Sequence, residues 1–190
     1  TLNYNFLRSN NTDIMEILNT IIPNNNTLNC FLLFVARALC GESSTELVIL
    51  LQTITDKNRD FIINLIRKTF GYLCHYSDNI KSFGNEHNTE ELNVAKIIII
   101  DTINSISYND YNKLITNKNV LDDNNALNVN IIFACNKNPK IDDRIVENIG
   151  KIELSNNYNN KNKINEIDFM LLLLKYVSKY INTILYLIEK

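Results

Sequence analysis

Three uninterrupted apolar runs constrain the fold of this chain more than any other feature of its sequence. The runs are "NCFLLFV" (29–35), "AKIIII" (95–100) and "NVNIIFAC" (128–135). Apolar runs of this length, without polar alternation, are typical of strands that are covered on both faces of a sheet. A shorter fourth strand is predicted at "KIEL" (151–154). Such strands occur in parallel sheets flanked by helices, so the chain is predicted to have an α/β fold.

Helical spacing between these runs predicts the helices that cover the sheet. In 11–22, four apolar residues recur on one face, namely Ile14, Ile17, Leu18 and Ile21. A capping box from Ser43 to Glu46 predicts that a helix begins there and covers 43–54. Further helices are predicted over 60–76, with a strand possible near its end, and in short form over 110–115 and 142–150. The pattern from 163 to the end is helical, as one helix or as two helices broken near Lys179.

Composition limits the classes of protein that this chain can belong to. Of its 190 residues 45% are hydrophobic, enough for a core, and the net charge of −2 argues against a globally basic nucleic-acid binder. The four widely spaced cysteines predict a reducing compartment, either cytosol or nucleus. No run approaches the about 18 apolar residues of a membrane span, so no membrane partner is expected.

The segment "ARALCGES" (36–43) follows the first apolar run on the frame of a phosphate-binding loop. Such a loop has the pattern GxxxxGK[ST], in which glycines let backbone amides surround phosphates and the lysine neutralises them. Gly41 and Ser43 match the pattern, whereas Ala36 replaces the first glycine and Glu42 replaces the lysine. Alone, the match is no better than a chance loop between two buried segments.

Two later segments have the order expected of the other nucleotide-site motifs. "IIIID" ends on Asp101 in the manner of a Walker B strand, whose carboxylate holds magnesium. "NIIFACN" ends on Asn136, like a sensor 1 strand with a polar residue that reaches the γ-phosphate. Structural roles for Asp101 and Asn136, as a strand cap and as a turn residue, remain open alternatives.

These motifs in this order resemble the AAA+ domain of the origin recognition complex and Cdc-type initiator clade. Within it the chain looks most similar to the degenerate silencing branch, the silent information regulator type. The resemblance covers about 10–175 and implies a degenerate AAA+ core over 1–160 and a helical lid or C-terminal helical segment over 161–190. It also implies that Thr102 stands where the Walker B glutamate is expected, Asn104 at a second acidic position and Asn148 near the arginine finger.

All of these departures remove charged groups that nucleotide chemistry needs. The resemblance therefore implies a scaffold without enzyme activity, cofactor, metal or small-molecule substrate, which binds protein partners in nuclear chromatin during silencing or origin recognition. A regulatory subunit that binds ATP without hydrolysing it is one alternative, and an unrelated interaction domain, possibly viral, is another. A cysteine-protease reading of Cys30 is disfavoured because both histidines, His75 and His87, precede the third apolar run.

Two further groups of residues are candidates for contacts with partners. Four cations form the best local group for a possible DNA contact: Lys137, Lys140, Arg144 and Lys151. Three tyrosines of the last helical segment could anchor a partner helix: Tyr176, Tyr180 and Tyr186. A solvated helix residue is the alternative for Arg144, and a core helix is the alternative for the tyrosine segment.

Overall fold

The computed structural model describes residues 11–42, 48–53, 56–78, 94–101, 104–120, 129–135, 138–156 and 164–188. Five strands form one parallel sheet: β1 (Val48–Gln52), β2 (Cys74–Ser77), β3 (Ile97–Ile100), β5 (Asn130–Cys135) and β7 (Ile149–Glu153). Their order across the sheet is β2-β3-β5-β1-β7. A second, two-stranded parallel sheet consists of β4 (Ser105–Ile106) and β6 (Lys140–Ile141). The predicted α/β fold with a parallel sheet is therefore confirmed.

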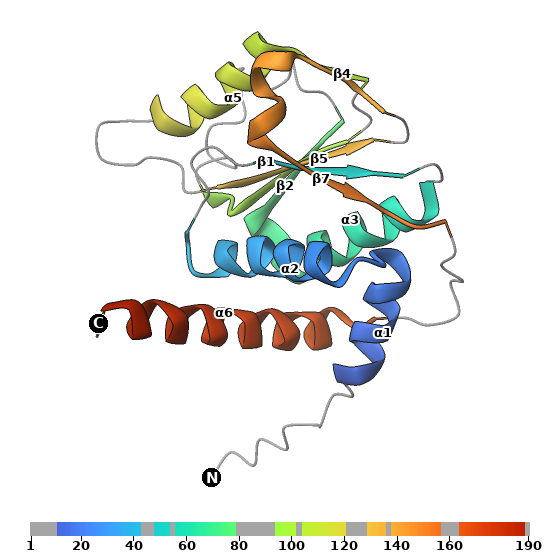
Figure 1. Cartoon of the computed structure of the whole chain (residues 1–190), viewed down its shortest axis with the longest axis vertical. Helices are drawn as coiled ribbons and strands as arrows, with labels where there is room; N and C mark the ends of the chain where they lie inside the picture. Colours follow the sequence, from blue (N-terminus) through green and yellow to red (C-terminus); the bar gives the residue numbers. More distant parts are fainter. Residues whose placement is uncertain are drawn as a thin grey trace.

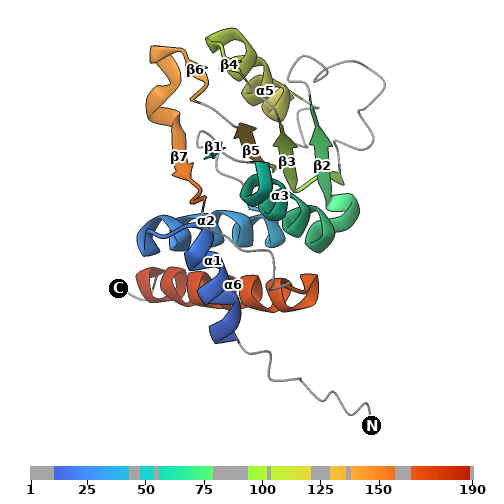
Figure 2. The ribbon, with the colours of Figure 1, turned by 90° about the vertical axis from the view of Figure 1, so that its right-hand side faces the viewer.

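Helices cover both faces of the sheet, as Figures 1 and 2 show. On one face lie α1 (Asn11–Ile21), α2 (Asn25–Leu39) and α3 (Asp56–Phe70), and α6 (Glu166–Ile188) forms a further layer outside them. On the other face lie α5 (Tyr108–Val120) and the 3-10 helix η4 (Asp143–Asn148). The short 3-10 helix η1 (Gly71–Leu73) joins α3 to β2.

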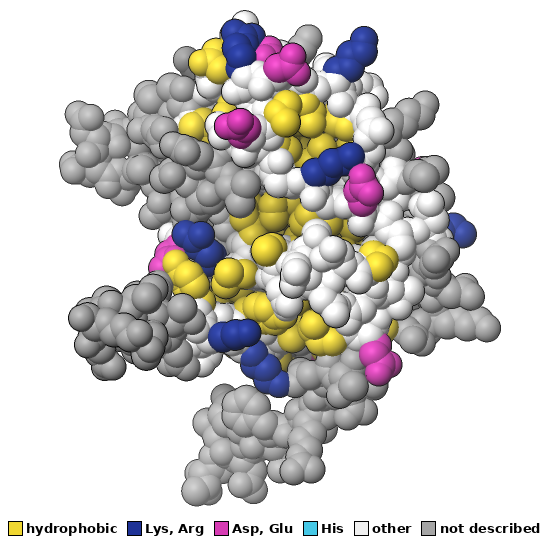
Figure 3. All heavy atoms as spheres, viewed as in Figure 1, with side chains coloured by type: hydrophobic (Ala, Val, Ile, Leu, Met, Phe, Trp, Pro, Cys, Tyr) yellow, Lys and Arg dark blue, Asp and Glu magenta, His cyan; other side chains and the backbone are white. Residues whose placement is uncertain are grey.

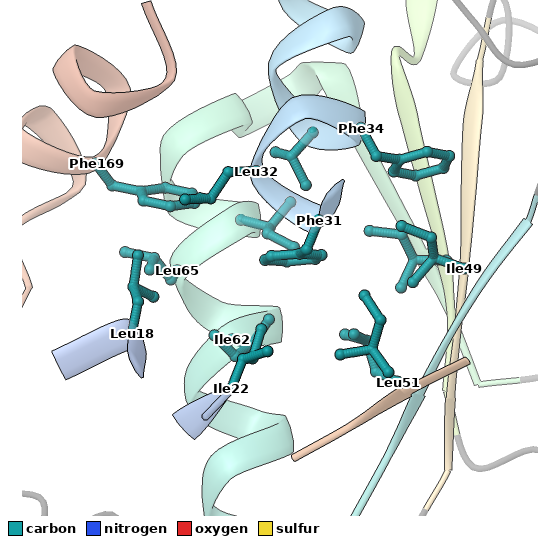
Figure 4. Packing of buried hydrophobic residues seen from close by; sticks show 14 of the residues in the cluster. Leu18, Ile22, Phe31, Leu32, Phe34, Ile49, Leu51, Ile62, Leu65 and Phe169 are labelled. Carbon is teal, nitrogen blue, oxygen red and sulfur yellow. The ribbon is translucent and has the colours of Figure 1, made fainter. Parts of the chain in front are cut away.

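Two separate cores explain why the strands are continuous apolar runs. In β3, Ile97 and Ile99 pack against the layer of α1, α2 and α3, whereas Ile98 and Ile100 pack toward α5. All four side chains are therefore buried. The larger core brings together side chains from four helices and the sheet, as Figure 4 shows, with Phe31 of α2 among Leu18, Ile62 and Leu51.

The predicted strand over 29–35 is wrong, because this segment lies within helix α2. Asn24 caps the helix by accepting a hydrogen bond from the Thr27 amide at 3.0 Å. The helix is apolar on most sides because it lies between the sheet and α6, so Phe34 and Leu32 are both buried. A helix covered on two sides gives the same continuous run as a buried strand, and periodicity alone does not separate the two.

The predicted helix over 43–54 is also wrong in its second half, where the structure has the strand β1. Val48 to Leu51 are buried at the centre of the sheet, between β5 and β7. The capping-box residues Ser43 and Glu46 lie outside the described residues. β1 pairs on both sides, and this tertiary environment outweighs a local helical signal.

The remaining predicted elements are confirmed with shifted bounds. Helix α1 buries the four residues predicted for its inner face, and the segment predicted as a helix with a strand near its end becomes α3 followed by β2. Helix α5 is longer than predicted and includes part of the polar loop expected there, while η4 replaces a short α-helix. Helix α6 continues through Lys179 without a break and packs on α1, α2 and α3.

Candidate functional site

The carboxyl ends of the parallel strands meet at one edge of the sheet, which is where α/β proteins bind ligands. Asp101 directly follows β3, and the connection 53–55 leads from β1 into α3. Ser155 follows β7 at the same edge, since β7 pairs in register with β1. The site is therefore built from the ends of three strands and the first turn of α3.

Arg59 fills the space between these elements with a buried guanidinium. Its side chain is only 7% exposed, and its Nε lies 3.4 Å from Oδ1 of Asp101, which is also 7% exposed. The Nη2 atom lies 3.2 Å from Asp56 and 3.1 Å from Asp60, two carboxylates at the solvent side of the same helix. Arg59 thus connects the start of α3 to the end of β3 through an ion pair shielded from water.

Tyr76 holds the other oxygen of Asp101. Its hydroxyl donates a hydrogen bond to Oδ2 at 2.8 Å, while its ring lies 4.4 Å below the guanidinium carbon of Arg67. Burial, and then the hydrogen bond to Asp101, raise the pKa of Tyr76 to about 12. The hydroxyl therefore keeps its proton at neutral pH and stays a donor to the carboxylate.

Asn58 fixes the first turn of α3 against the end of β7. The residue is 1% exposed, and its side-chain amide donates to the carbonyl oxygen of Ser155. Ser155 in turn donates its backbone N–H to the carbonyl of Ile21, at 2.7 Å, in the last turn of α1. This chain of bonds links α1, β7 and α3 at the same edge.

Where the structure describes it, the edge has few of the properties that phosphate binding requires. The segment from Gln52 to Asp56, "QTITD", contains no glycine, the residue type whose conformational freedom a phosphate-binding loop uses. Asp56 occupies the first turn of α3, where its charge is favoured by the helix dipole but repels an anion. Among the described residues, no group of three or more His, Cys, Asp or Glu side chains could hold a metal ion.

The predicted phosphate-loop residues instead form the end of helix α2. Ala36 is buried within the helix, and Gly41 adopts a left-handed φ of 70° just after it. The Gly41 amide donates to Ala38 at 3.1 Å and the Glu42 amide to Arg37 at 3.1 Å, the two bonds of a Schellman helix end. Gly41 is therefore a helix-terminating glycine, and Ser43 lies outside the described residues.

Glu42 joins the end of α2 to α6. Its carboxylate lies 3.4 Å from Nε of Arg37, whose guanidinium stacks over the ring of Tyr180 at 5.4 Å. A hydrogen bond to Glu42 is the main cause that raises the pKa of Tyr180. The acidic residue at the expected lysine position is thus a contact between two helices.

The other predicted nucleotide-site positions are scattered. Of those that the structure describes, only Asp101 lies in the cluster around Arg59. Asn148 ends η4, and the carbonyl of Asn104 accepts a hydrogen bond from the amide of Lys140 at 3.1 Å. Thr102 and Asn136 lie outside the described residues.

Two of the four cations that are predicted to contact DNA form ion pairs with carboxylates. Arg144 forms an ion pair with Asp142 at 2.7 Å and stacks over Tyr108, and this pairing holds the pKa of Asp142 well below its usual range. Lys151 lies 3.0 Å from Glu153. On the face of the molecule shown in Figure 3, the described Lys and Arg side chains lie apart from one another. Several of them lie beside an acidic side chain. Lys140 is exposed, and Lys137 lies outside the described residues.

Two of the three tyrosines that are predicted to anchor a partner contact side chains of α2. Tyr176 donates a hydrogen bond to the side chain of Asn29 in α2, and Tyr180 packs on Arg37 as described above. The side chain of Tyr186 lies outside the described residues. Among the side chains of this helix that the structure describes, the exposed large apolar ones are Ile167, Leu174 and Ile181.

Sequence reasoning missed Arg59, Tyr76 and Asn58, which form the site with Asp101. The one local signal was the charged segment "DKNRD" (56–60) after a buried run, but 43–54 was interpreted as a helix. With β1 assigned as a strand, that segment becomes the first turn of a strand-following helix. Arg59 would then be a candidate for the partner of Asp101.

Comparisons with known proteins identify the fold of this chain. No protein-family model and no curated protein matches it. Three solved apo structures of the NrS-1 C-terminal region are similar, with TM-scores of 0.59, 0.60 and 0.61 at 13%, 13% and 14% identity. Each match covers 86% of this chain, which spans 42%, 43% and 42% of those chains. The chain thus shares the fold of less than half of the NrS-1 region.

Proposed function

We propose that this domain is a non-hydrolysing, AAA+-like module whose phosphate site is closed by its own arginine. The buried ion pair between Arg59 and Asp101 carries this proposal. In a working P-loop ATPase, the Walker B carboxylate holds magnesium beside the phosphates. Here the guanidinium occupies the cation's place next to the carboxylate, so the domain has no need of a metal to balance that charge.

The strand arrangement supports the assignment of Asp101 to a Walker B position. In AAA+ proteins the sensor 1 strand lies between the P-loop strand and the Walker B strand, and in this sheet β5 lies between β1 and β3. The phosphate loop of such a protein would then lie at 53–55, between β1 and α3, and not at 36–43. That short connection lacks glycine.

Protein partners in chromatin, a nuclear location and a role in silencing or origin recognition remain predictions from the sequence resemblance. The distinguishing physical property is the lack of a response to nucleotide. A domain that acts only by binding partners keeps the same stability with and without ATP. A regulatory ATP-binding subunit gains stability with nucleotide.

Thermal unfolding with magnesium and either ATPγS or ADP tests the proposal. We expect the melting temperature to stay unchanged, and no phosphate release with ATP. A nucleotide that bound with a Kd of about 1 μM and was present at about 1 mM would add about 4 kcal/mol to the unfolding free energy. For a chain of this size that corresponds to a rise of about 10 °C. Such a rise would favour the regulatory alternative.

A further inference from the structure

A second surface, at the β2 edge of the sheet, has the chemistry to hold an anion. A hollow of about 520 Å³ opens there between the end of α3, η1 and β2. It is lined by Asn64, Arg67, Lys68, Gly71, Cys74, His75 and Tyr76. Among the described residues, the lining contains two cations and a histidine but no carboxylate. This hollow adjoins the closed site around Arg59 and shares Tyr76 with it.

The guanidinium of Arg67 is held in position by the ring of Tyr76. Its guanidinium lies over the ring of Tyr76 at 4.4 Å, and Tyr76 is itself fixed by the hydrogen bond to Asp101. Arg67 and Lys68 also complement the dipole at the end of α3, which explains their presence in the last turn. Both residues nevertheless remain exposed to solvent, so the helix end does not use up their charge.

Tyr72 is not one of the residues that line the hollow, but it directly follows Gly71, which lines it, and it offers an exposed aromatic ring. It is 81% exposed, the most exposed large hydrophobic side chain in the described part of the chain. The adjacent Gly71 has a φ of 55°, and this left-handed turn ends α3 and carries the chain into β2. A tyrosine this exposed adds little to the stability of the fold, whereas an unpaired base can stack on its ring.

We infer that this hollow binds single-stranded nucleic acid, with a backbone phosphate at Arg67 and Lys68 and a base stacked on Tyr72. A basic groove with an aromatic platform is the common design of proteins that bind single strands without sequence preference. A duplex keeps its bases paired and offers no free face to Tyr72. Since the chain has a net charge of −2, binding is expected to be weak and to depend on this local patch.

Fluorescence anisotropy with a labelled oligothymidylate of about 16 nucleotides tests the inference, in low salt and without nucleotide or magnesium. Tyr72→Ala is expected to raise the Kd about 5-fold or more, because one base loses its stacking partner. Lys68→Glu is expected to weaken binding and to flatten the dependence of log Kd on log salt, because each phosphate that is neutralised on a single strand contributes a slope of about 0.7. A duplex of the same length should bind more weakly.

Lys113→Glu in α5 is the matched control, since it changes the net charge equally from an exposed position in the layer on the other face of the sheet. It should leave the Kd within about 2-fold of wild type, because single-strand contacts are local to the groove. Tyr72→Phe should retain binding because the ring remains. Lys68 is exposed, and the melting temperature of Lys68→Glu verifies that the variant folds.

Three results would overturn the inference. They are the absence of binding, equal losses in Lys68→Glu and Lys113→Glu, and no effect of Tyr72→Ala together with full competition by inorganic pyrophosphate. The last result would identify a simple anion site. None of these measurements depends on whether the Arg59 site binds ATP, so the inference and the proposed function can fail independently.

Discussion

At the scale of single residues, the loss of Arg59 is expected to have a large effect on stability. Arg59→Met would leave the Asp101 carboxylate buried without its cation. Removal of one partner of a buried ion pair typically costs about 3–5 kcal/mol of unfolding free energy. Urea unfolding should therefore show a large decrease for this variant, and Asp101→Asn should restore part of it in the double variant.

The exposed Lys57, two residues earlier in the same helix, provides the control for Arg59. Lys57→Met removes a positive charge from the same turn but from a solvated position, so a change within about 0.5 kcal/mol is expected. Equal effects of the two substitutions would show that the ion pair with Asp101 contributes nothing specific.

Tyr76 gives the site a signature at alkaline pH. Its pKa rises from 10.0 to about 12 in the folded protein, because of burial and the bond to Asp101. An unfolded chain loses this proton at lower pH than the folded one, so the stabilisation is complete below pH 10 and is lost as the pH rises toward 12. Burial also raises the pKa of Cys74 from 9.0 to about 12, which adds a loss of the same sign.

Stability measured from pH 8 to about 12 in wild type and Tyr76→Phe separates these contributions. The variant should be less stable at neutral pH by about 1–3 kcal/mol, since Asp101 loses a donor. This difference in unfolding free energy should shrink above pH 10, because only the wild type has a hydroxyl at position 76 that can ionise. Tyr72→Phe, at an exposed position, should follow the wild-type curve; a constant difference for Tyr76→Phe would contradict the assignment.

At the scale of elements, the sequence predicted most strands and helices and misassigned one adjacent pair. β3 and β5 were predictable because their apolar runs are short and both of their faces are covered by other elements. α2 has the same apolar character for a different reason, since the sheet covers one side and α6 the other. No local pattern distinguishes these cases, because the covering helix α6 lies more than a hundred residues later in the chain.

The misassignment of α2 and β1 also placed the predicted phosphate loop at the wrong position. Once α2 was interpreted as the first strand, Gly41 appeared to follow a strand, although its left-handed φ serves to end a helix. Asp101 is identifiable from the sequence because it directly follows β3, which is a clear apolar run. Arg59 is not identifiable in this way, because its role depends on the start of α3 lying beside the end of β3. The sequence does not show the strand order that brings these two ends together.

At the scale of the whole molecule, two crossovers place the helices on opposite faces of the sheet. From β1 the chain moves toward the β2 edge through α3, and from β3 it moves back toward β5 through α5. Opposite directions of travel require opposite faces if both connections have the right-handed form that parallel strands favour. Helix α2 lies on the same face of the sheet as α3. Its apolar side that points away from the sheet is covered by α6.

We therefore expect α6 to unfold together with the sheet and not as a separate lid. Phe169 of α6 is fully buried against the helical layer, whereas Ile167, two residues earlier, is 64% exposed. Phe169→Ala should lower the unfolding free energy by about 3–5 kcal/mol, and Ile167→Ala should change it little. In both variants, circular dichroism and tyrosine fluorescence should give one coincident transition, as for a single cooperative unit. An early helical transition in Phe169→Ala, with the sheet still folded, would instead make 161–190 an independent segment.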